Sequence, residues 1–313
     1  MTVFQSMILG LIQGIAEFLP ISSSGHLAVA QHLFGLTDVP ILYDVLLHIA
    51  TLEAVIIYFR KKIGRLLCVF GRWITRRPAP DTIDEEDFLS GTEERGRKTI
   101  IAVIISTAIT AVIGILTNKL IPELSIKVTC GGFIVTACLL VFSSIMEKRE
   151  NRNNITASGE NTDNQEAAEV PAENAKPKSD GISWIQAVVI GIMQGIGTLP
   201  GISRSGSTIA GGQLSKLKRT AAGEYSFIIS IPAILGAFVL GLKDYIDIMK
   251  NGTVEAVQAA SISALPLIAG WIVAFVSGYF SLAFLMKLIK KGKLEWFACY
   301  LIPAGILGMI FLK

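Results

Sequence analysis

Long apolar stretches that recur along almost the whole chain are the feature that most restricts its fold. Six of them can be traced, at residues 43–59, 99–116, 128–146, 222–242, 264–288 and 296–312. Each is close to the roughly 20 residues that a helix needs to cross the hydrocarbon core of a bilayer. Hydrophobic residues make up 51% of the chain and charged residues only 17%, which excludes a soluble domain of this length. We therefore expect an all-α, polytopic membrane protein.

An internal repeat divides the chain. The segment LGLIQGIAEFLPISSSGH at 9–26 aligns without a gap with IGIMQGIGTLPGISRSGS at 190–207, and a similar apolar stretch follows each one. The sequence thus has two halves, residues 1–150 and 181–313. Residues 151–180 between them are polar, poor in aromatic residues and interrupted by prolines. This composition predicts a disordered linker.

Each half begins with a polar motif between two apolar arms, at residues 3–36 and 183–218. The arm from His26 to Leu36 has 11 residues, about 16 Å of helix, which cannot cross a hydrocarbon core of ~30 Å. We therefore expect a re-entrant helix–loop–helix in each half, followed by three transmembrane helices. Three is odd, so the second half would be inserted upside down. Inverted repeats of this kind place a site near the midplane between them.

The distribution of basic residues predicts the orientation. The loops at 60–98, 147–182, 216–219 and 287–293 share one side of this topology and hold ten, five, three and four Lys or Arg, together 22 of the 28 in the chain. The positive-inside rule makes this side, and the linker with it, cytoplasmic. Both termini are then outside, and the first hairpin enters from the outside. The first residues carry no basic segment typical of a cleavable signal peptide.

Two polar side chains in the first motif are candidate metal ligands. Ionisable groups at membrane depth are costly and usually mark function. Gln13 and Glu17 are four residues apart and share one helix face. They suit a hard divalent cation, which prefers oxygen ligands. A protonated Glu17 that is only hydrogen-bonded within the bundle is the alternative.

The serines that follow predict an anion site. Pro20 ends the first arm, and one of Ser22, Ser23 and Ser24 is expected to cap the helix that begins near Gly25. A helix start presents free N–H groups and the positive end of the helix dipole, and therefore binds anions. One cap explains one serine but not three.

The second motif adds a cation to this anion site. Ser203 or Ser205 can cap its second arm, so two helix starts would converge from opposite faces on one phosphate. Arg204, which aligns with Ser23, can bind phosphate in a bidentate manner. Its anion could be the substrate phosphate or Glu17.

Histidine and further acids complete the candidates. His26 lies within the first motif beside the serines, where it suits general acid–base or nucleophilic chemistry; a histidine that only accompanies the helix cap is the alternative. His32 and His48 are alternatives, although His48 lies within a span. Asp44 could support the metal or His26, and Glu53 has no assigned role.

These motifs resemble a known family. QGIAEFLPISSSGH and LPGISRSGSTIAGG are similar to the two signature motifs of the undecaprenyl-diphosphate phosphatase family, the bacitracin-resistance type. The resemblance implies removal of the terminal phosphate from a C55 isoprenyl diphosphate to give the monophosphate carrier for cell-wall peptidoglycan synthesis. It also implies a Mg²⁺ or Ca²⁺ requirement and a site that opens to the outer face of the cell membrane.

The family's functional positions can be carried over by motif. Gln13 and Glu17 fall on its acidic pair, where many members have Glu in place of Gln13. The catalytic candidates are Glu17, Ser23 and His26, and Asp44 takes a position that is often acidic. The phosphate-binding candidates are Arg204, Ser203, Ser205, Ser22, Ser24 and Gly25.

The resemblance leaves the mechanism open. Ser23 attacks the terminal phosphorus with His26 as base, or His26 attacks it directly or activates a water molecule. In each case Arg204 and the helix starts bind the phosphoryl oxygens.

The polyprenyl tail would lie in a lipid-facing groove between the halves. The expected partners are the lipid substrate and the lipids of the membrane, and we expect no nucleic acid partner. The paired glycines at 131–132 and 211–212 would allow close helix contacts in a homodimer. A transporter or flippase of an anionic polyprenyl lipid is the rival function, because broken helices in inverted repeats are common in transporters.

Overall fold

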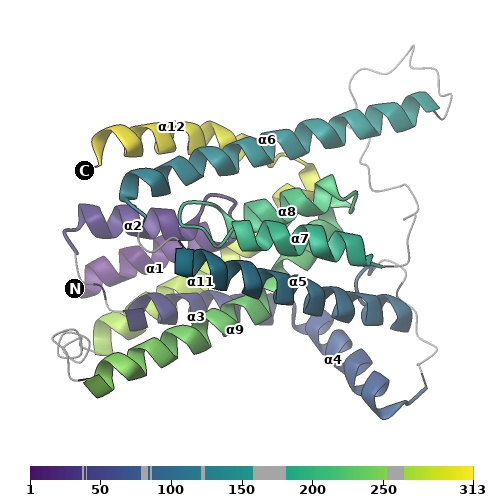
Figure 1. The fold of residues 1–313 in the computed structure, drawn as a ribbon, viewed down its shortest axis with the longest axis horizontal. Coiled ribbons are helices and arrows are strands. Elements are labelled where there is room, and N and C mark those ends of the chain that lie inside the picture. Colours follow the sequence, from purple (N-terminus) through teal and green to yellow (C-terminus); the bar gives the residue numbers. More distant parts are fainter. Residues whose placement is uncertain are drawn as a thin grey trace.

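The computed structural model describes residues 1–36, 39, 41–78, 84, 87–120, 124–157, 181–251 and 264–312. Over these residues the chain forms eleven helices and no strand, which confirms the all-α prediction (Figure 1). The helices are α1 (Val3–Phe18), α2 (Ser23–Leu33), α3 (Ile41–Tyr58), α4 (Arg60–Thr75), α5 (Glu93–Leu120), α6 (Ile126–Ala157), α7 (Trp184–Ile196), α8 (Arg204–Leu214), α9 (Arg219–Asn251), α11 (Ala264–Lys291) and α12 (Trp296–Phe311).

Four helices are long and apolar enough to cross a membrane: α5, α6, α9 and α11. They correspond to four of the six predicted spans. Helices α3 and α12 have 18 and 16 residues and correspond to the other two, whose crossing stays a prediction. Helix α6 continues to Ala157, seven residues into the predicted linker, and residues 158–180 lie outside the described residues. Helix α4 lies in a segment that we expected to be a loop.

The first arm of each hairpin begins in the same way. Thr2 caps α1 and exchanges hydrogen bonds with Gln5, and Ser183 caps α7 and exchanges hydrogen bonds with Gln186. Each pair is a capping box, which satisfies two backbone N–H groups at the helix start. The second arms, α2 and α8, have 11 residues each. All four arms are therefore shorter than the ~20 residues of a spanning helix.

The two halves are interlocked. Helix α1 of the first half packs along α11 of the second, and α7 of the second half packs along α5 of the first. Small residues allow the close approach of α1 and α11: a Cβ atom on Gly14 would lie 2.7 Å from the backbone N of Gly278. The two chain termini lie at the same end of the molecule, on the left in Figure 1.

Two buried tyrosines fix the helices that follow the hairpins. The Tyr43 hydroxyl, on α3, lies 3.0 Å from Ser6 Oγ, and the Tyr225 hydroxyl, on α9, lies 2.8 Å from Ser106 Oγ. Both tyrosines are fully buried. Because α3 and α9 also pack against each other, these bonds hold in place the two helices that flank the centre of the molecule.

Candidate functional site

The tips of the two hairpins meet inside the bundle. The Ser205 hydroxyl, at the second tip, donates a hydrogen bond of 3.4 Å to the carbonyl of Leu19 at the first. A Cβ atom on Gly206 would lie 3.2 Å from Cβ of Pro20, so the tips are also in van der Waals contact. The backbone N–H of Ser203 donates to Thr136 Oγ1 of α6 at 2.9 Å, which anchors the second tip to the first half.

A serine caps each of the helices that start at the tips, as the sequence predicted. Ser22 Oγ accepts from the N–H of Gly25, and Ser203 Oγ accepts from the N–H of Gly206, at 3.3 and 3.1 Å. Ser22 has a φ of 73°, in the left-handed region that serine rarely adopts. Such a backbone costs about 1–3 kcal/mol and is typical of functional loops.

The Glu17 carboxylate lies at the centre of this junction. It accepts hydrogen bonds from Gln13 Nε2 at 3.1 Å, from Ser23 Oγ at 2.6 Å and from Arg204 Nη2 at 2.5 Å. The Glu17 and Arg204 side chains are 5% and 14% exposed, so the ion pair that joins the two halves is largely withdrawn from water. A desolvated pair of this kind is held by charge and by hydrogen bonds at once.

Two polar atoms beside this ion pair are left without a partner. Arg204 Nη1 and Gln13 Oε1 are buried, and neither has a hydrogen-bond partner among the described residues. Buried polar atoms are nearly always paired in native proteins, so each unpaired atom needs a separate explanation. A bound anion would pair with the guanidinium, and a cation or a donor group would pair with the amide oxygen.

A cavity of about 390 Å³ opens beside the Glu17–Arg204 pair. Its polar lining comes from both hairpins and from α3: Glu17, Ser23, Ser24, Asp44, His48, Gly197, Thr198, Ser203 and Arg204. Its apolar lining comes largely from α9: Ala16, Val45, Ile202, Ala233, Ile234, Ala237 and Phe238. The cavity can therefore receive a molecule that is anionic at one end and apolar at the other.

Helix α3 contributes two polar side chains to the cavity. Asp44 Oδ1 accepts from Gln31 Nε2 at 3.1 Å. His48 Nδ1 donates to the carbonyl of Asp44 at 2.8 Å, which leaves Nε2 turned toward Glu17 Oε2 at 3.9 Å. The sequence suggests His48 only as an alternative to His26. The i, i+4 spacing from Asp44 puts both side chains on one helix face, and this signal could have identified it.

His26 lies elsewhere. It lines a second cavity of about 300 Å³, formed mainly by apolar residues of α2, α6 and α12. Its Nδ1 donates to the carbonyl of Ser22 at 2.8 Å, its Nε2 lies 2.7 Å from the Tyr300 hydroxyl, and the ring stacks on Phe133. Both ring nitrogens are thus engaged. Of the residues expected to act together, Glu17, Ser23 and Arg204 are joined by direct contacts, whereas His26 does not line their cavity.

Three groups carry oxygen atoms of the kind that a hard divalent cation prefers. The described residues contain no group of three or more His, Cys, Asp or Glu side chains arranged to hold a metal. They do provide the Glu17 carboxylate, the Asp44 carboxylate in the same cavity and the unpaired Oε1 of Gln13. Mg²⁺ is usually bound through one or two carboxylates together with substrate phosphate and water.

The fold and the site define an integral membrane protein whose buried arginine–carboxylate pair faces an amphiphilic cavity. The family model of the bacitracin resistance protein BacA matches residues 6–307, and this chain belongs to that family. An undecaprenyl-diphosphatase of Treponema denticola is 42% identical over 306 residues, which cover 98% of this chain and 96% of the relative. Undecaprenyl-diphosphatases of Carboxydothermus hydrogenoformans and Borrelia recurrentis are 33% and 34% identical, each over at least 95% of both chains.

Proposed function

We propose that this protein hydrolyses undecaprenyl diphosphate to undecaprenyl phosphate and inorganic phosphate. This reaction recycles the lipid carrier of peptidoglycan synthesis and confers resistance to bacitracin. The observation that carries the proposal is the contact of Ser23, Glu17 and Arg204 at the polar end of a cavity with an apolar wall. The names of the relatives support the same reaction.

The cavity suggests how the substrate lies. The diphosphate occupies the polar end, where Arg204 Nη1 lacks a partner and the N-termini of α2 and α8 converge. The first isoprene units of the tail contact the apolar wall formed by Val45, Ile234 and Phe238. The exposed Ala237 continues this wall toward the surface of α9, so the rest of the tail can extend into the lipid.

Ser23 is the nucleophile in this proposal. Its hydroxyl already donates to Glu17 Oε2 at 2.6 Å, so the carboxylate can accept the proton as Oγ attacks the terminal phosphorus. The bond from this phosphorus to the bridging oxygen breaks and releases undecaprenyl phosphate. Water then attacks the phosphoserine, and inorganic phosphate leaves as Ser23 regains its proton. Arg204 offsets the charge that develops on the phosphoryl oxygens.

Glu17, Asp44 and the Oε1 atom of Gln13 would hold a Mg²⁺ or Ca²⁺ ion. The ion would supply charge neutralisation for the phosphoryl oxygens. His26 is a positioning residue in this proposal, because its Nδ1 holds the carbonyl of Ser22 and thereby the serine tip. The family resemblance implies a site that opens to the outer face of the membrane, and this agrees with a first hairpin, carrying Glu17 and Ser23, that enters from the side opposite to the basic loops.

Phosphate release from a polyprenyl diphosphate by the purified protein in detergent tests the reaction. We expect release by the natural chain and loss of release in Glu17→Gln and Ser23→Ala. A protein that is folded but releases no phosphate would contradict the proposal, and lipid translocation in vesicles by the same preparation would then favour the rival transporter.

The nucleophile needs its own experiment. Rapid quenching with substrate labelled in the terminal phosphate should trap label on Ser23. Label on His26 would assign the attack to the imidazole. Turnover that leaves no label on the protein would assign it to water.

A further inference from the structure

Helix α4 has three distinct faces. Leu66 and Val69 are buried against the bundle. Three large apolar side chains on an adjoining face are exposed, two of them strongly: Leu67 (64%), Phe70 and Ile74 (65%). Trp73 lies between Leu66 and Val69 on the helical wheel and is 37% exposed. At 100° per residue, the remaining face carries small or polar residues: Gly64, Cys68, Gly71 and Thr75. A helix that meets protein, an apolar medium and water on three sides is typical of the boundary between membrane and water.

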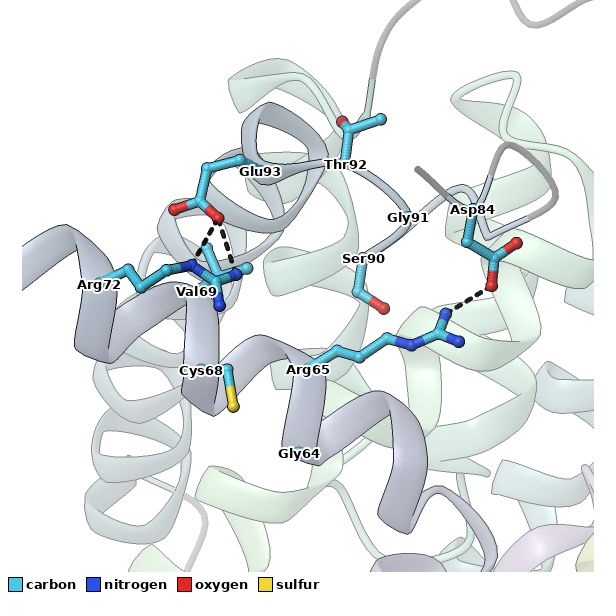
Figure 2. Close-up of a pocket in the computed structure, with 10 residues that line it drawn as sticks. All are labelled: Gly64, Arg65, Cys68, Val69, Arg72, Asp84, Ser90, Gly91, Thr92 and Glu93. Carbon is cyan, nitrogen blue, oxygen red and sulfur yellow. Dashed lines mark hydrogen bonds and ion pairs between the residues drawn. The ribbon is translucent and has the colours of Figure 1, made fainter. Parts of the chain in front are cut away.

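Ion pairs fix the rotation of α4 about its axis. Arg65 Nη1 pairs with Asp84 at 2.6 Å, and Arg72 binds Glu93 through two nitrogens, at 2.8 and 3.1 Å (Figure 2). Asp84 belongs to the segment that precedes α5, and Glu93 is the first residue of α5. The guanidinium groups therefore hold one side of α4 against the protein, and the face with Leu67 and Ile74 is turned away from it.

A third pair ties α4 to α9. Lys62 Nζ contacts both Asp87, at 3.0 Å, and Glu224 at the beginning of α9, at 2.5 Å. Burial raises the pKa of Asp87, but the hydrogen bond from Ser90 and the charge of Lys62 outweigh burial and hold this pKa below its ordinary value. Asp87 is therefore ionised at neutral pH, and the contact to Lys62 is a true ion pair.

Four other cations of this segment have no ion-pair partner among the described residues. Arg60 and Lys61 at the start of α4, and Arg76 and Arg77 at its end, are exposed. No carboxylate of the described residues lies within ion-pair distance of them. They flank the apolar face at both ends, which is where the head groups of anionic lipids would lie if this face were inserted in the bilayer.

The position of α4 agrees with this arrangement. It leaves the bundle obliquely, toward the end of the molecule opposite to the two termini (Figure 1). The predicted topology puts most of the basic residues of the chain on the same side as α4. A single residue, Phe59, separates α4 from α3.

We infer that α4 is an interfacial helix that inserts its apolar face between lipids and binds anionic phospholipid head groups through Arg60, Lys61, Arg76 and Arg77. The inference does not depend on the reaction that the protein catalyses. The helix joins α3 directly and α9 through Lys62, so bound anionic lipid would also stabilise the pair of helices that flank the central cavity.

Spin labels test the insertion. The three exposed cysteines are first removed by Cys68→Ser, Cys138→Ser and Cys299→Ser. In this background, one protein carries a spin label at Ile74→Cys and a second protein carries it at Thr75→Cys. In nanodiscs we expect the label at 74 to collide several-fold more often with oxygen, relative to a water-soluble nickel complex, than the label at 75. Equal exposure of both labels to nickel would overturn the inference. Immobilisation of the label at 74 only in discs with two protein copies would assign the face to a dimer instead.

Head-group selectivity is tested with spin-labelled phosphatidylglycerol and phosphatidylcholine. Changing Arg60, Lys61, Arg76 and Arg77 to Gln should lower the preference for phosphatidylglycerol by up to about five-fold per cation at low salt. The matched control changes Lys119, Lys127, Lys243 and Lys250, four exposed lysines on the other side of the predicted topology, to Gln. An equal loss in both proteins, or no loss in either, would show that α4 does not select anionic lipid.

Discussion

Glu17 joins the two hairpin tips through one side chain. Its carboxylate accepts a hydrogen bond from the Ser23 hydroxyl of its own hairpin and forms an ion pair with the Arg204 guanidinium of the other hairpin. A change at either partner therefore acts on the carboxylate as well as on the partner itself. Substitutions that preserve charge or shape are more informative here than truncation, because truncation leaves a buried charge unpaired.

Arg204→Lys should separate binding geometry from charge. Lysine keeps the positive charge beside Glu17 but cannot bind Glu17 and a phosphate through two separate nitrogens of a planar fork. We expect phosphate release to fall by roughly 10²-fold, with little change in thermal stability. Steady-state release and unfolding temperature in detergent measure the two effects. If Arg204→Lys released phosphate as fast as the unchanged protein, the role of Arg204 would be limited to neutralising the charge of Glu17.

His26→Asn should distinguish positioning from proton transfer. The Nδ2 atom of asparagine can take the place of His26 Nδ1 and donate to the carbonyl of Ser22, but asparagine cannot exchange a proton near neutral pH. We expect His26→Asn to retain most of the phosphate release that His26→Ala loses. If both proteins lose release to the same extent while remaining folded, the imidazole itself takes part in the reaction.

The sequence predicted the composition of the site better than its geometry. Charge and hydroxyl groups at membrane depth are rare enough to identify Glu17, Ser23 and Arg204 from the motifs alone. The direction in which His26 points depends on contacts with Phe133 and Tyr300. These residues are distant in the chain, and no local pattern indicates that they pack together.

At the scale of helices, the seam between α1 and α11 depends on the absence of side chains. Gly10 and Gly14 face Gly270 and Gly278, and the backbones approach too closely for a methyl group. Lipid offers no hydrophobic driving force between helices, so association depends on this packing. The seam is also what joins the first hairpin to the second half of the chain.

Gly14→Ala should therefore destabilise the protein, by about 1–3 kcal/mol for overpacking. The matched control is Gly114→Ala on α5, where an added Cβ would meet no atom within 4 Å and where alanine favours the helix. Thermal aggregation in detergent, followed by size-exclusion chromatography, compares the two. If both variants had the same aggregation midpoint temperature, the contact between α1 and α11 could accept a methyl group without loss of stability.

Helix α4 shows what a search for spans overlooks. Its apolar residues Ile63, Leu66, Phe70, Trp73 and Ile74 recur at helical spacing, so its amphipathic pattern was readable in the sequence. Seven basic residues at 60–77 exclude it as a span, and we therefore expected a loop. The criterion of length and mean hydropathy finds helices that cross a membrane but not helices that lie on it.

The whole molecule is held by contacts between its halves. Helix α1 packs on α11, α7 packs on α5, and Glu17 pairs with Arg204 across the centre. The sequence repeat predicted two similar halves, but only the three-dimensional arrangement shows that each hairpin packs against the other half. Neither half can then be expected to build the central cavity alone.

The predicted orientation is a property of the entire chain, and cysteine labelling can test it. The positive-inside rule puts α4 in the cytoplasm and both termini outside. In intact cells that carry a chain with the exposed Cys138 and Cys299 changed to Ser, a membrane-impermeant maleimide should label a cysteine added after Lys313 but not the exposed Cys68 of α4. Permeabilised cells should label both. Because both positions are read in one chain, poor expression or misfolding would lower both signals, whereas labelling of Cys68 alone in intact cells would reverse the topology and place the opening of the site on the inner face.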